Sequence, residues 1–372
     1  MRILLPLAVI VVLYSLAYGT AAESRIIIDG TVVNAIAHDD MLPLREVVEH
    51  IGGAVSWNRR SQQVTINHGS QTIVVTVGSR SATINNNPFH LSSSPQIING
   101  QVMMPVDFFA YQLGLGTGYI NSSFILSTTP ATSIPVLVYH HILPDEVNIY
   151  FTNNAWTIST QNFTQQMQFL SENGFYTPTL NELEAFLYYG RPLPQNSIMI
   201  HFDDGYYSNY VYALPILQKY GLRAVLFPIT GNASALGETQ PSIDHTRLTH
   251  TSASTLRTGL DIFETASHSH TLHDRAPDSN NQTLLVVSTH ETIVTDTVQS
   301  FNYLTNHRAY AYPLGMFNDT VIYALQEAGI TMAFTVNTGY ITQATDPFRL
   351  PRFTIYQDTA LTRFQMIANR RA

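Results

Sequence analysis

The chain of 372 residues contains no cysteine. This absence excludes disulfide bonds, a cysteine nucleophile and a thiolate metal site, so an exported form of the protein depends on its core for stability. Lysine is almost absent, since Lys219 is the only one, and the net charge of −8 argues against a nucleic-acid partner. What is present is a 45% hydrophobic, 12% charged composition, which indicates a folded chain whose length suggests two domains.

No apolar run beyond the N-terminus is long enough to cross a bilayer. The run at residues 3–17 follows Arg2 and precedes the small residues 19–22, an order typical of a secretory signal. It is shorter than the roughly 20 residues of a membrane span. We therefore expect a signal peptide at 1–22, cleavage near Ala22, and a secreted or cell-surface chain without a membrane span; an uncleaved N-terminal anchor is the alternative.

Residues 25–126 carry short strand signals and an internal repeat. Asp29-Gly30 separates Ile26-Ile27-Ile28 from Thr31-Val32-Val33, which predicts a hairpin. Residues 41–44 and 103–106 each open an expected helix with a proline, and a glycine nine residues after the proline ends it. The pattern predicts a small α+β domain.

The two copies of the repeat lie in LPLREVVEHIGGAVSWN, from residue 42, and INGQVMMPVDFFAYQLG, from residue 98. With them the region resembles the copper amine oxidase N-terminal-like domain, which is common in exported bacterial proteins. Copper chemistry does not follow, because the histidines here lack ligand spacing, and a copper oxidase remains the weakest hypothesis. We expect a module that binds or tethers to a cell-wall or surface glycan. The histidines of this region that lack ligand spacing are His38, His50, His68 and His90.

The Ser/Thr/Pro-rich residues 127–135 are expected to form a linker, and from 136 to 372 predicted strands and helices alternate. About seven such units favour a barrel, in which chemistry lies where strands end. The predicted strands are 136–139, 197–202, 224–229, 262–266, 309–312 and 332–336. The predicted helices are 162–173, 212–220, one long helix within 284–305, and 319–328.

Adjacent carboxylates close the second of these strands, at Asp203 and Asp204 in HFDDG. Like charges this close repel, so the pKa of one carboxyl group should rise unless a nearby cation balances the charge or the two carboxylates have different partners. A metal ion would do both, because it would hold one carboxylate as a ligand and leave the other as a base for water.

Three histidines, His268, His270 and His273, follow the fourth strand and suggest the remaining ligands. On a helix His268 and His273 would point about 140° apart and could not share an ion, whereas His270 and His273 could. In a loop that restriction disappears. Either pair is therefore open from the residues alone, and so is a polar loop without metal.

The segments IPVLVYHHI, HFDDGYYSNY, SHSHTLH and AYPLG occur in this order between Ile134 and the C-terminus. Together they resemble the motifs of the NodB-type polysaccharide deacetylases, the carbohydrate esterases of family four, in the poly-N-acetylglucosamine deacetylase-like branch. The resemblance implies a distorted, incomplete (β/α) barrel of about seven strands and one divalent metal ion, with zinc expected.

The resemblance also implies roles for the site residues. Asp203 is the expected general base, and Asp204, His268 and His273 are the expected metal ligands. His273 stands one residue after the usual position, which here is Leu272, and ligation by His270 is the alternative. The main chain of the AYPLG segment is expected to bind substrate and stabilise the oxyanion, through Tyr312, Pro313, Leu314 and Gly315.

Two family features are missing. Ala311 replaces the arginine that steadies the catalytic aspartate, and Arg352 is either its substitute or part of a surface salt bridge. The Leu-x-His that supplies a general acid is absent, with Arg363 near its position, so His141, His270 and a metal-bound water stay open for that role. His140 lies either near the site or in the core.

The resulting hypothesis is a metal-dependent hydrolase that removes N-acetyl groups from a polysaccharide containing N-acetylglucosamine: peptidoglycan, poly-N-acetylglucosamine or a chitin-like polymer. The alternative, favoured by the missing features, is a non-catalytic carbohydrate-binding or cell-surface adhesion protein that has kept the deacetylase fold.

Overall fold

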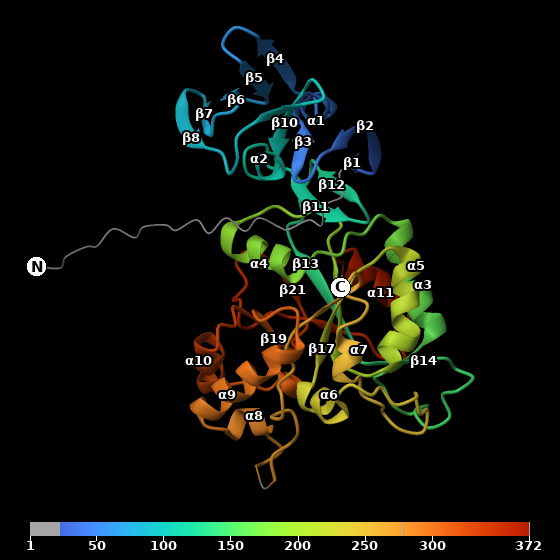
Figure 1. The fold of residues 1–372 in the computed structure, drawn as a ribbon. Helices are drawn as coiled ribbons and strands as arrows, with labels where there is room; N and C mark the ends of the chain where they lie inside the picture. Colours follow the sequence, from blue (N-terminus) through green and yellow to red (C-terminus); the bar gives the residue numbers. More distant parts are fainter. Residues whose placement is uncertain (1–22, 278, 372) are drawn as a thin grey trace, which may run out of the picture. The chain divides into compact units, whose positions relative to one another are not determined.

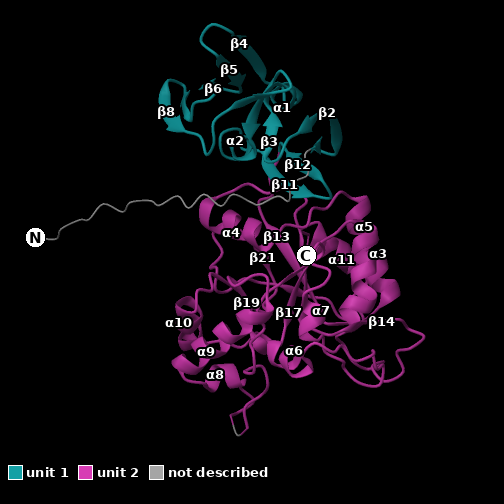
Figure 2. Ribbon diagram, in the orientation of Figure 1, with its two compact units in different colours: residues 1–128 teal, residues 129–372 magenta. Residues whose placement is uncertain are grey.

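The computed structural model describes residues 23–277 and 279–371, and the expected signal peptide lies outside them (Figure 1). The chain divides into two compact units, residues 1–128 and residues 129–372 (Figure 2). No helix in the described ranges is both long enough and apolar enough to cross a membrane.

Unit 1 is built from short strands in three sheets. The first sheet has the order β11-β12-β1-β2, the second β3-β10-β9 and the third β4 to β8 in sequence. The predicted hairpin is confirmed, because β1 and β2 pair antiparallel around Asp29 and Gly30, whose φ angles are +48° and +79°. The strands are β1 (Ser24–Ile28), β2 (Thr31–Ala37), β3 (Met41–Pro43), β4 (Ala54–Asn58), β5 (Gln63–His68), β6 (Gln71–Thr76), β7 (Ser81–Ile84), β8 (Asn87–His90), β9 (Gln96–Ile98), β10 (Gln101–Pro105), β11 (Gly116–Ile120) and β12 (Ser123–Ser127).

The two copies of the internal repeat pair with each other. β3 and β10 run antiparallel, and each leads directly into a helix, α1 (Leu44–His50) or α2 (Val106–Tyr111). The expectation that a proline opens each helix is wrong by one position. Pro43 and Pro105 are the N-cap residues, with φ near −66° and −61° in extended backbone, because they still belong to the paired strands.

Unit 2 is organised on a mainly parallel sheet. β18, β17, β16 and β13 are parallel neighbours, β22 is parallel to β13, and β21 joins β13 antiparallel. Every residue of β13 and β17 is buried, as expected for strands covered on both faces. These strands are β13 (Ile134–Tyr139), β16 (Met199–Asp204), β17 (Ala224–Pro228), β18 (Phe263–Thr265), β21 (Tyr340–Ile341) and β22 (Phe353–Thr354).

A second parallel pair, β19 (Ala309–Ala311) and β20 (Met332–Phe334), lies between β18 and β22 in the order of pairings. Its connections are single bridges, Ser267 to Tyr310 on one side and Phe334 to Leu350 on the other. The pair β19 and β20 is thus connected to the main sheet by single bridges and not by continuous ladders of hydrogen bonds. The expected barrel of about seven strands therefore stays a prediction, whereas the alternation of parallel strands and helices places unit 2 in the α/β class.

Helices flank this sheet (Figure 1). The long helix expected within 284–305 is α9 (His290–Ser300): Ser288 is extended (ψ 156°), which separates it from the short α8 (Leu284–Val287), and Thr289 caps α9 by accepting the N–H of Thr292. The remaining elements are β14 (His141–Leu143), β15 (Thr157–Ser159), α3 (Thr160–Glu172), α4 (Leu180–Tyr189), a π-helical turn (Asn209–Ala213) running into α5 (Leu214–Tyr220), α6 (Thr230–Leu236), α7 (Ala253–Leu256), α8 (Leu284–Val287), α9 (His290–Ser300), a 3-10 turn (Phe301–Tyr303), a second 3-10 turn (Pro313–Gly315), α10 (Asp319–Glu327) and α11 (Leu361–Ala368).

Val294, Val298 and Phe301 recur in helical register and predict an apolar buried face for this helix, which is wrong at Val298. Val298 is 48% exposed, and the buried side of α9 is mostly polar. Its buried residues are Ile293, Asp296, Thr297 and Ser300.

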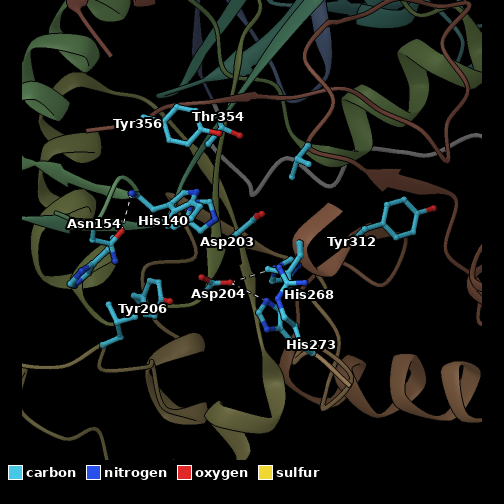
Figure 3. Close-up of a pocket in the computed structure, with 16 residues that line it drawn as sticks. His140, Asn154, Asp203, Asp204, Tyr206, His268, His273, Tyr312, Thr354 and Tyr356 are labelled. Atoms are coloured by element: carbon cyan, nitrogen blue, oxygen red, sulfur yellow. Dashed lines mark hydrogen bonds and ion pairs between the residues drawn. The ribbon is translucent and has the colours of Figure 1, made fainter. Parts of the chain in front are cut away.

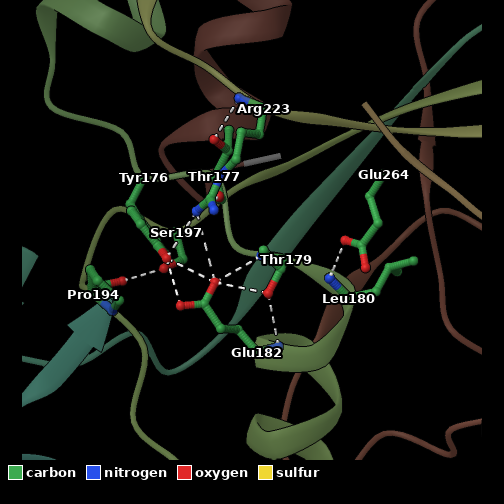
Figure 4. A network of polar contacts seen from close by, with 9 residues as sticks. All are labelled: Tyr176, Thr177, Thr179, Leu180, Glu182, Pro194, Ser197, Arg223 and Glu264. Carbon is green, nitrogen blue, oxygen red and sulfur yellow. Dashed lines mark hydrogen bonds and ion pairs between the residues drawn. The ribbon is translucent and has the colours of Figure 1, made fainter. Parts of the chain in front are cut away.

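A buried polar network lies before the start of β17 (Figure 4). Glu182, only 2% exposed, accepts the Tyr176 hydroxyl at 2.7 Å and the Thr179 N–H at 2.8 Å. Arg223 donates to the same tyrosine oxygen at 3.1 Å, so the charged side chains of Glu182 and Arg223 belong to one hydrogen-bonded cluster. Because the network is at the amino end of the strand, we interpret it as a stabilising element rather than a reactive one.

Candidate active site

The last two residues of β16 are Asp203 and Asp204, and both line a cavity of about 500 Å³ (Figure 3). The chain turns sharply here, because Asp204 and Gly205 both have positive φ, +70° and +72°. A Cβ on Gly205 would lie 2.6 Å from the Cβ of Pro228, so only glycine fits. The strained turn is what carries the two carboxylates into the cavity.

Asp204 faces two of the three histidines in the SHSHTLH segment. Its Oδ1 lies 3.5 Å from Nε2 of His268 and 3.4 Å from Nε2 of His273. The three ligand atoms lie within 4.8 Å of one another. Two ligands of one tetrahedral zinc ion, each about 2.0–2.1 Å from it, are themselves about 3.3–3.4 Å apart, so the spacing fits such an ion. One carboxylate and two imidazoles also suit a divalent metal chemically.

A hydrogen bond at the second ring nitrogen fixes the orientation of the His268 side chain. Its Nδ1 is 2.8 Å from the carbonyl oxygen of Ala311, so the N–H tautomer at Nδ1 leaves Nε2 free to bind. Burial would raise the pKa of Asp204, but the interactions with His268 and then His273 outweigh it and hold that pKa well below its ordinary value. Asp204 is therefore an anion, as a ligand must be.

Asp203 has a separate partner. Arg352, fully buried, donates from both terminal nitrogens to the two carboxylate oxygens, each at 2.8 Å, and from Nε to the carbonyl of Thr335 at 2.8 Å. Burial alone would raise the pKa of Asp203, but the Arg352 charge, followed by His268, lowers it below its ordinary value. The surface salt bridge considered for Arg352 is wrong, because β22 places it inside, beside the aspartate.

His270 lies elsewhere. The segment that follows β18 is a loop, and in it the His270 Nδ1 lies 2.9 Å from the Thr230 hydroxyl while its ring stacks on Tyr303, with centroids 5.9 Å apart. His270 does not line the cavity. The structure thus brings His268 and His273 to Asp204, and leaves out His270.

Two residues of the AYPLG segment, Tyr312 and Leu314, line the cavity. The Tyr312 ring points away from Asp204 in Figure 3, stacks on Phe317 and donates its hydroxyl to the carbonyl of Phe348 at 3.0 Å. Leu314 lines the cavity in a left-handed conformation, φ +53° and ψ 18°. Pro313 is buried in the same turn, and a Cβ on Gly315 would clash with Val336.

Two further histidines, His140 and His141, line the cavity. Burial lowers the pKa of His140, and it lowers the pKa of His141 to about 4. Both are thus neutral near pH 7, which does not suit a protonated general acid. Arg363 is exposed on α11 and does not line the cavity.

Several cavity residues escaped the sequence analysis. Tyr206 lies directly after the aspartate motif, and burial followed by the Asp204 charge raises its pKa. Trp156 and Tyr356 are aromatic side chains at the cavity that remain 50% and 41% exposed. They belong to loops far apart in the chain, and no spacing in the sequence connects them.

The structure thus combines a parallel α/β sheet, a carboxylate held by a buried arginine and an Asp-His-His group that could hold a metal ion. Residues 190–333 match the polysaccharide deacetylase family, and residues 30–123 match the copper amine oxidase N-terminal domain. The chain is 31% identical over 222 residues to the poly-β-1,6-N-acetyl-D-glucosamine N-deacetylase of Staphylococcus aureus strain MSSA476, covering 56% of this chain and 73% of that protein.

The corresponding enzyme of Staphylococcus epidermidis is 32% identical over 212 residues, 55% of this chain and 69% of that protein. The chain therefore belongs to the polysaccharide deacetylases, and it is an enzyme of the polysaccharide N-deacetylase class.

Solved structures share the fold. The Streptococcus pyogenes deacetylase PplD in complex with acetate aligns with a TM-score of 0.53 at 23% identity, over 64% of this chain and 99% of that one. IcaB from Ammonifex degensii aligns with a TM-score of 0.52 at 21% identity, over 65% and 99%.

Proposed function

We propose that the protein hydrolyses the N-acetyl amide of poly-β-1,6-N-acetyl-D-glucosamine, with zinc held by Asp204, His268 and His273. The observation that carries the proposal is the pair of adjacent aspartates with divided partners: histidines for Asp204, and Arg352 for Asp203. When bound, zinc would polarise the acetyl oxygen and lower the pKa of the attacking water.

Asp203 is the base in this proposal. Arg352 fixes both of its oxygens and keeps it ionised, so it can take a proton from water. The same proton is then available to the departing amine, which makes Asp203 the acid of the second step. The lowered pKa values of His140 and His141 support this assignment over an imidazolium donor.

Leu314 is the proposed oxyanion donor. Its N–H donates no hydrogen bond within the described ranges, and the left-handed turn fixes it beside the cavity. A preorganised donor of this kind stabilises the charge that develops on the acetyl oxygen.

The substrate assignment is supported by the staphylococcal relatives and by the exposed rings of Trp156 and Tyr356. Aromatic faces beside polar groups suit sugar rings, which present apolar C–H faces. A peptidoglycan or chitin-like polymer is the alternative substrate. Because the sequence carries the features of a signal peptide at 1–22, we place the enzyme outside the cytoplasm.

We also propose that unit 1 binds glycan. Trp57 is 39% exposed beside a cavity of about 240 Å³, and the Gln101 amide donates to Glu46 at 2.7 Å along the same wall. Full-length Trp57→Ala should then be retained less on immobilised poly-N-acetylglucosamine than Trp57→Phe, with unchanged hydrolysis of short soluble oligomers. Equal retention of both variants and the wild type would remove this role.

The test of the main proposal is acetate release from β-1,6 and β-1,4 N-acetylglucosamine oligomers, together with the metal content of the protein. Asp203→Asn should bind zinc and lose activity by at least 10³-fold. His273→Ala should lose zinc, whereas the matched variant His270→Ala should keep it. Undiminished acetate release by Asp203→Asn would overturn the base, and no release from any oligomer would favour a binding protein.

A further inference from the structure

The loop that carries the two imidazole ligands has a demanding shape. His268 and His273 are five residues apart, yet their ring centroids lie 4.9 Å apart and both rings face Asp204. The backbone between them must fold back, and Ser269 has φ +73°, which costs a non-glycine residue roughly 1–2 kcal/mol. Contacts from outside the loop must therefore hold it.

Asp296 on α9 supplies those contacts and is 4% exposed. Its Oδ2 accepts the Ser269 hydroxyl at 2.9 Å and the His270 N–H at 2.8 Å. Its Oδ1 accepts the Thr271 N–H at 2.7 Å and the Thr271 hydroxyl at 2.9 Å. All four donors come from the three consecutive residues 269–271, and in the described ranges no cation is paired with this carboxylate.

The same helix also holds the loop on the other side of His268. The Ser300 hydroxyl donates to the Ser267 hydroxyl at 2.9 Å. These contacts account for two of the polar residues on the buried side of α9, Asp296 and Ser300. Asp296 itself does not line the cavity that contains Asp203, so any influence on the reaction passes through the loop.

We propose that Asp296 is a positioning residue of the metal site: it fixes residues 269–271 so that His268 and His273 present their Nε2 atoms to one ion. The inference rests on the metal site proposed above. A carboxylate is required because four donors point at two oxygens, and a charged acceptor serves all of them. Asparagine has nearly the same shape but turns one oxygen into a donor facing two other donors.

The test measures zinc affinity of the full-length apoprotein by competition with a chromophoric chelator, and the visible spectrum of the cobalt-loaded protein. Asp296→Asn should bind zinc about 10- to 100-fold more weakly, the range for lost support of metal ligands, and should alter the cobalt spectrum. Glu291→Gln, an exposed carboxylate on the same helix, is the matched control and should change neither. Zinc affinity of Asp296→Asn within twofold of wild type would overturn the inference.

Thr271→Val decides the matter if Asp296→Asn does not fold by far-ultraviolet circular dichroism. It removes one of the four hydrogen bonds at constant volume and should weaken zinc about fivefold. Saturating zinc should restore activity to either folded variant but never to Asp203→Asn. A less stable apoprotein with wild-type zinc affinity and cobalt spectrum would mean a merely structural role.

Asp204→Asn separates the two proposals. This variant should lose zinc whether or not Asp296 positions the loop. If it keeps wild-type affinity, the proposed metal site is wrong; if it loses zinc while Asp296→Asn and Thr271→Val bind normally, only the positioning role is wrong.

Discussion

Replacing Arg352 with methionine should destabilise unit 2 by about 3–5 kcal/mol, the cost of leaving one buried charge without its partner. Arg352 is fully buried and Asp203 is 3% exposed, so the two 2.8 Å hydrogen bonds are shielded from bulk water. A Coulomb energy of about 4 kcal/mol at 4 Å and an effective dielectric constant near 20 gives the same magnitude. Because domains of this size are stable by about 5–15 kcal/mol, the midpoint of urea unfolding should fall clearly.

The measurement is urea unfolding of the apoprotein in chelator, so that metal binding adds no stability. The double variant Asp203→Asn/Arg352→Met removes both charges and should recover most of the loss while remaining inactive. A loss below about 1 kcal/mol for Arg352→Met, or a double variant no more stable than the single one, would contradict the buried-pair argument.

Three further predictions concern stability and the turn of the site. Burial, and then the charge of His245, lowers the pKa of His141 from 6.5 to about 4. Below pH 6.5 the unfolded chain therefore binds a proton at His141, whereas the folded chain binds it only near pH 4. Stability should therefore fall by up to about 3 kcal/mol as the pH drops through this window, and urea midpoints should show a flatter profile for His141→Phe; an equally steep profile would contradict this. Gly205→Ala should cost at least about 2 kcal/mol and most of the activity, because its Cβ meets Pro228 at positive φ; wild-type thermal unfolding would count against it. Glu182→Gln should cost about 1–3 kcal/mol in urea unfolding without altering activity per folded molecule, and a selective loss of activity would show that the network is not merely stabilising.

Most strands of unit 2 were predictable from short apolar runs, and several helices from the glycine that follows their last turn, because both signals are local in the sequence. Gly174 and Gly221 end α3 and α5 with φ +65°, as expected for helix C-termini. The sequence also held a signal for α4 that went unused: Thr179 and Glu182 form a reciprocal capping box.

The part of the site that follows from local sequence is the strand end with its two aspartates and the histidine loop. Arg352 lies 149 residues from Asp203, and only the pairing of β22 with β13 brings them together. No periodicity encodes that pairing, because β22 has two residues. The polar buried side of α9 escaped for a related reason: an apolar pattern cannot reveal a helix that packs against a loop through hydrogen bonds.

The pairing of β1 with β12 in unit 1 has a consequence for folding kinetics. Arg25 is aligned with Ser123 in this parallel ladder, so the first and last strands of the unit are neighbours. The unit therefore cannot complete its first sheet until almost its whole length has been synthesised, and closing so long a loop slows folding. Removing either strand would leave the other with an unpaired edge open to association with a second chain.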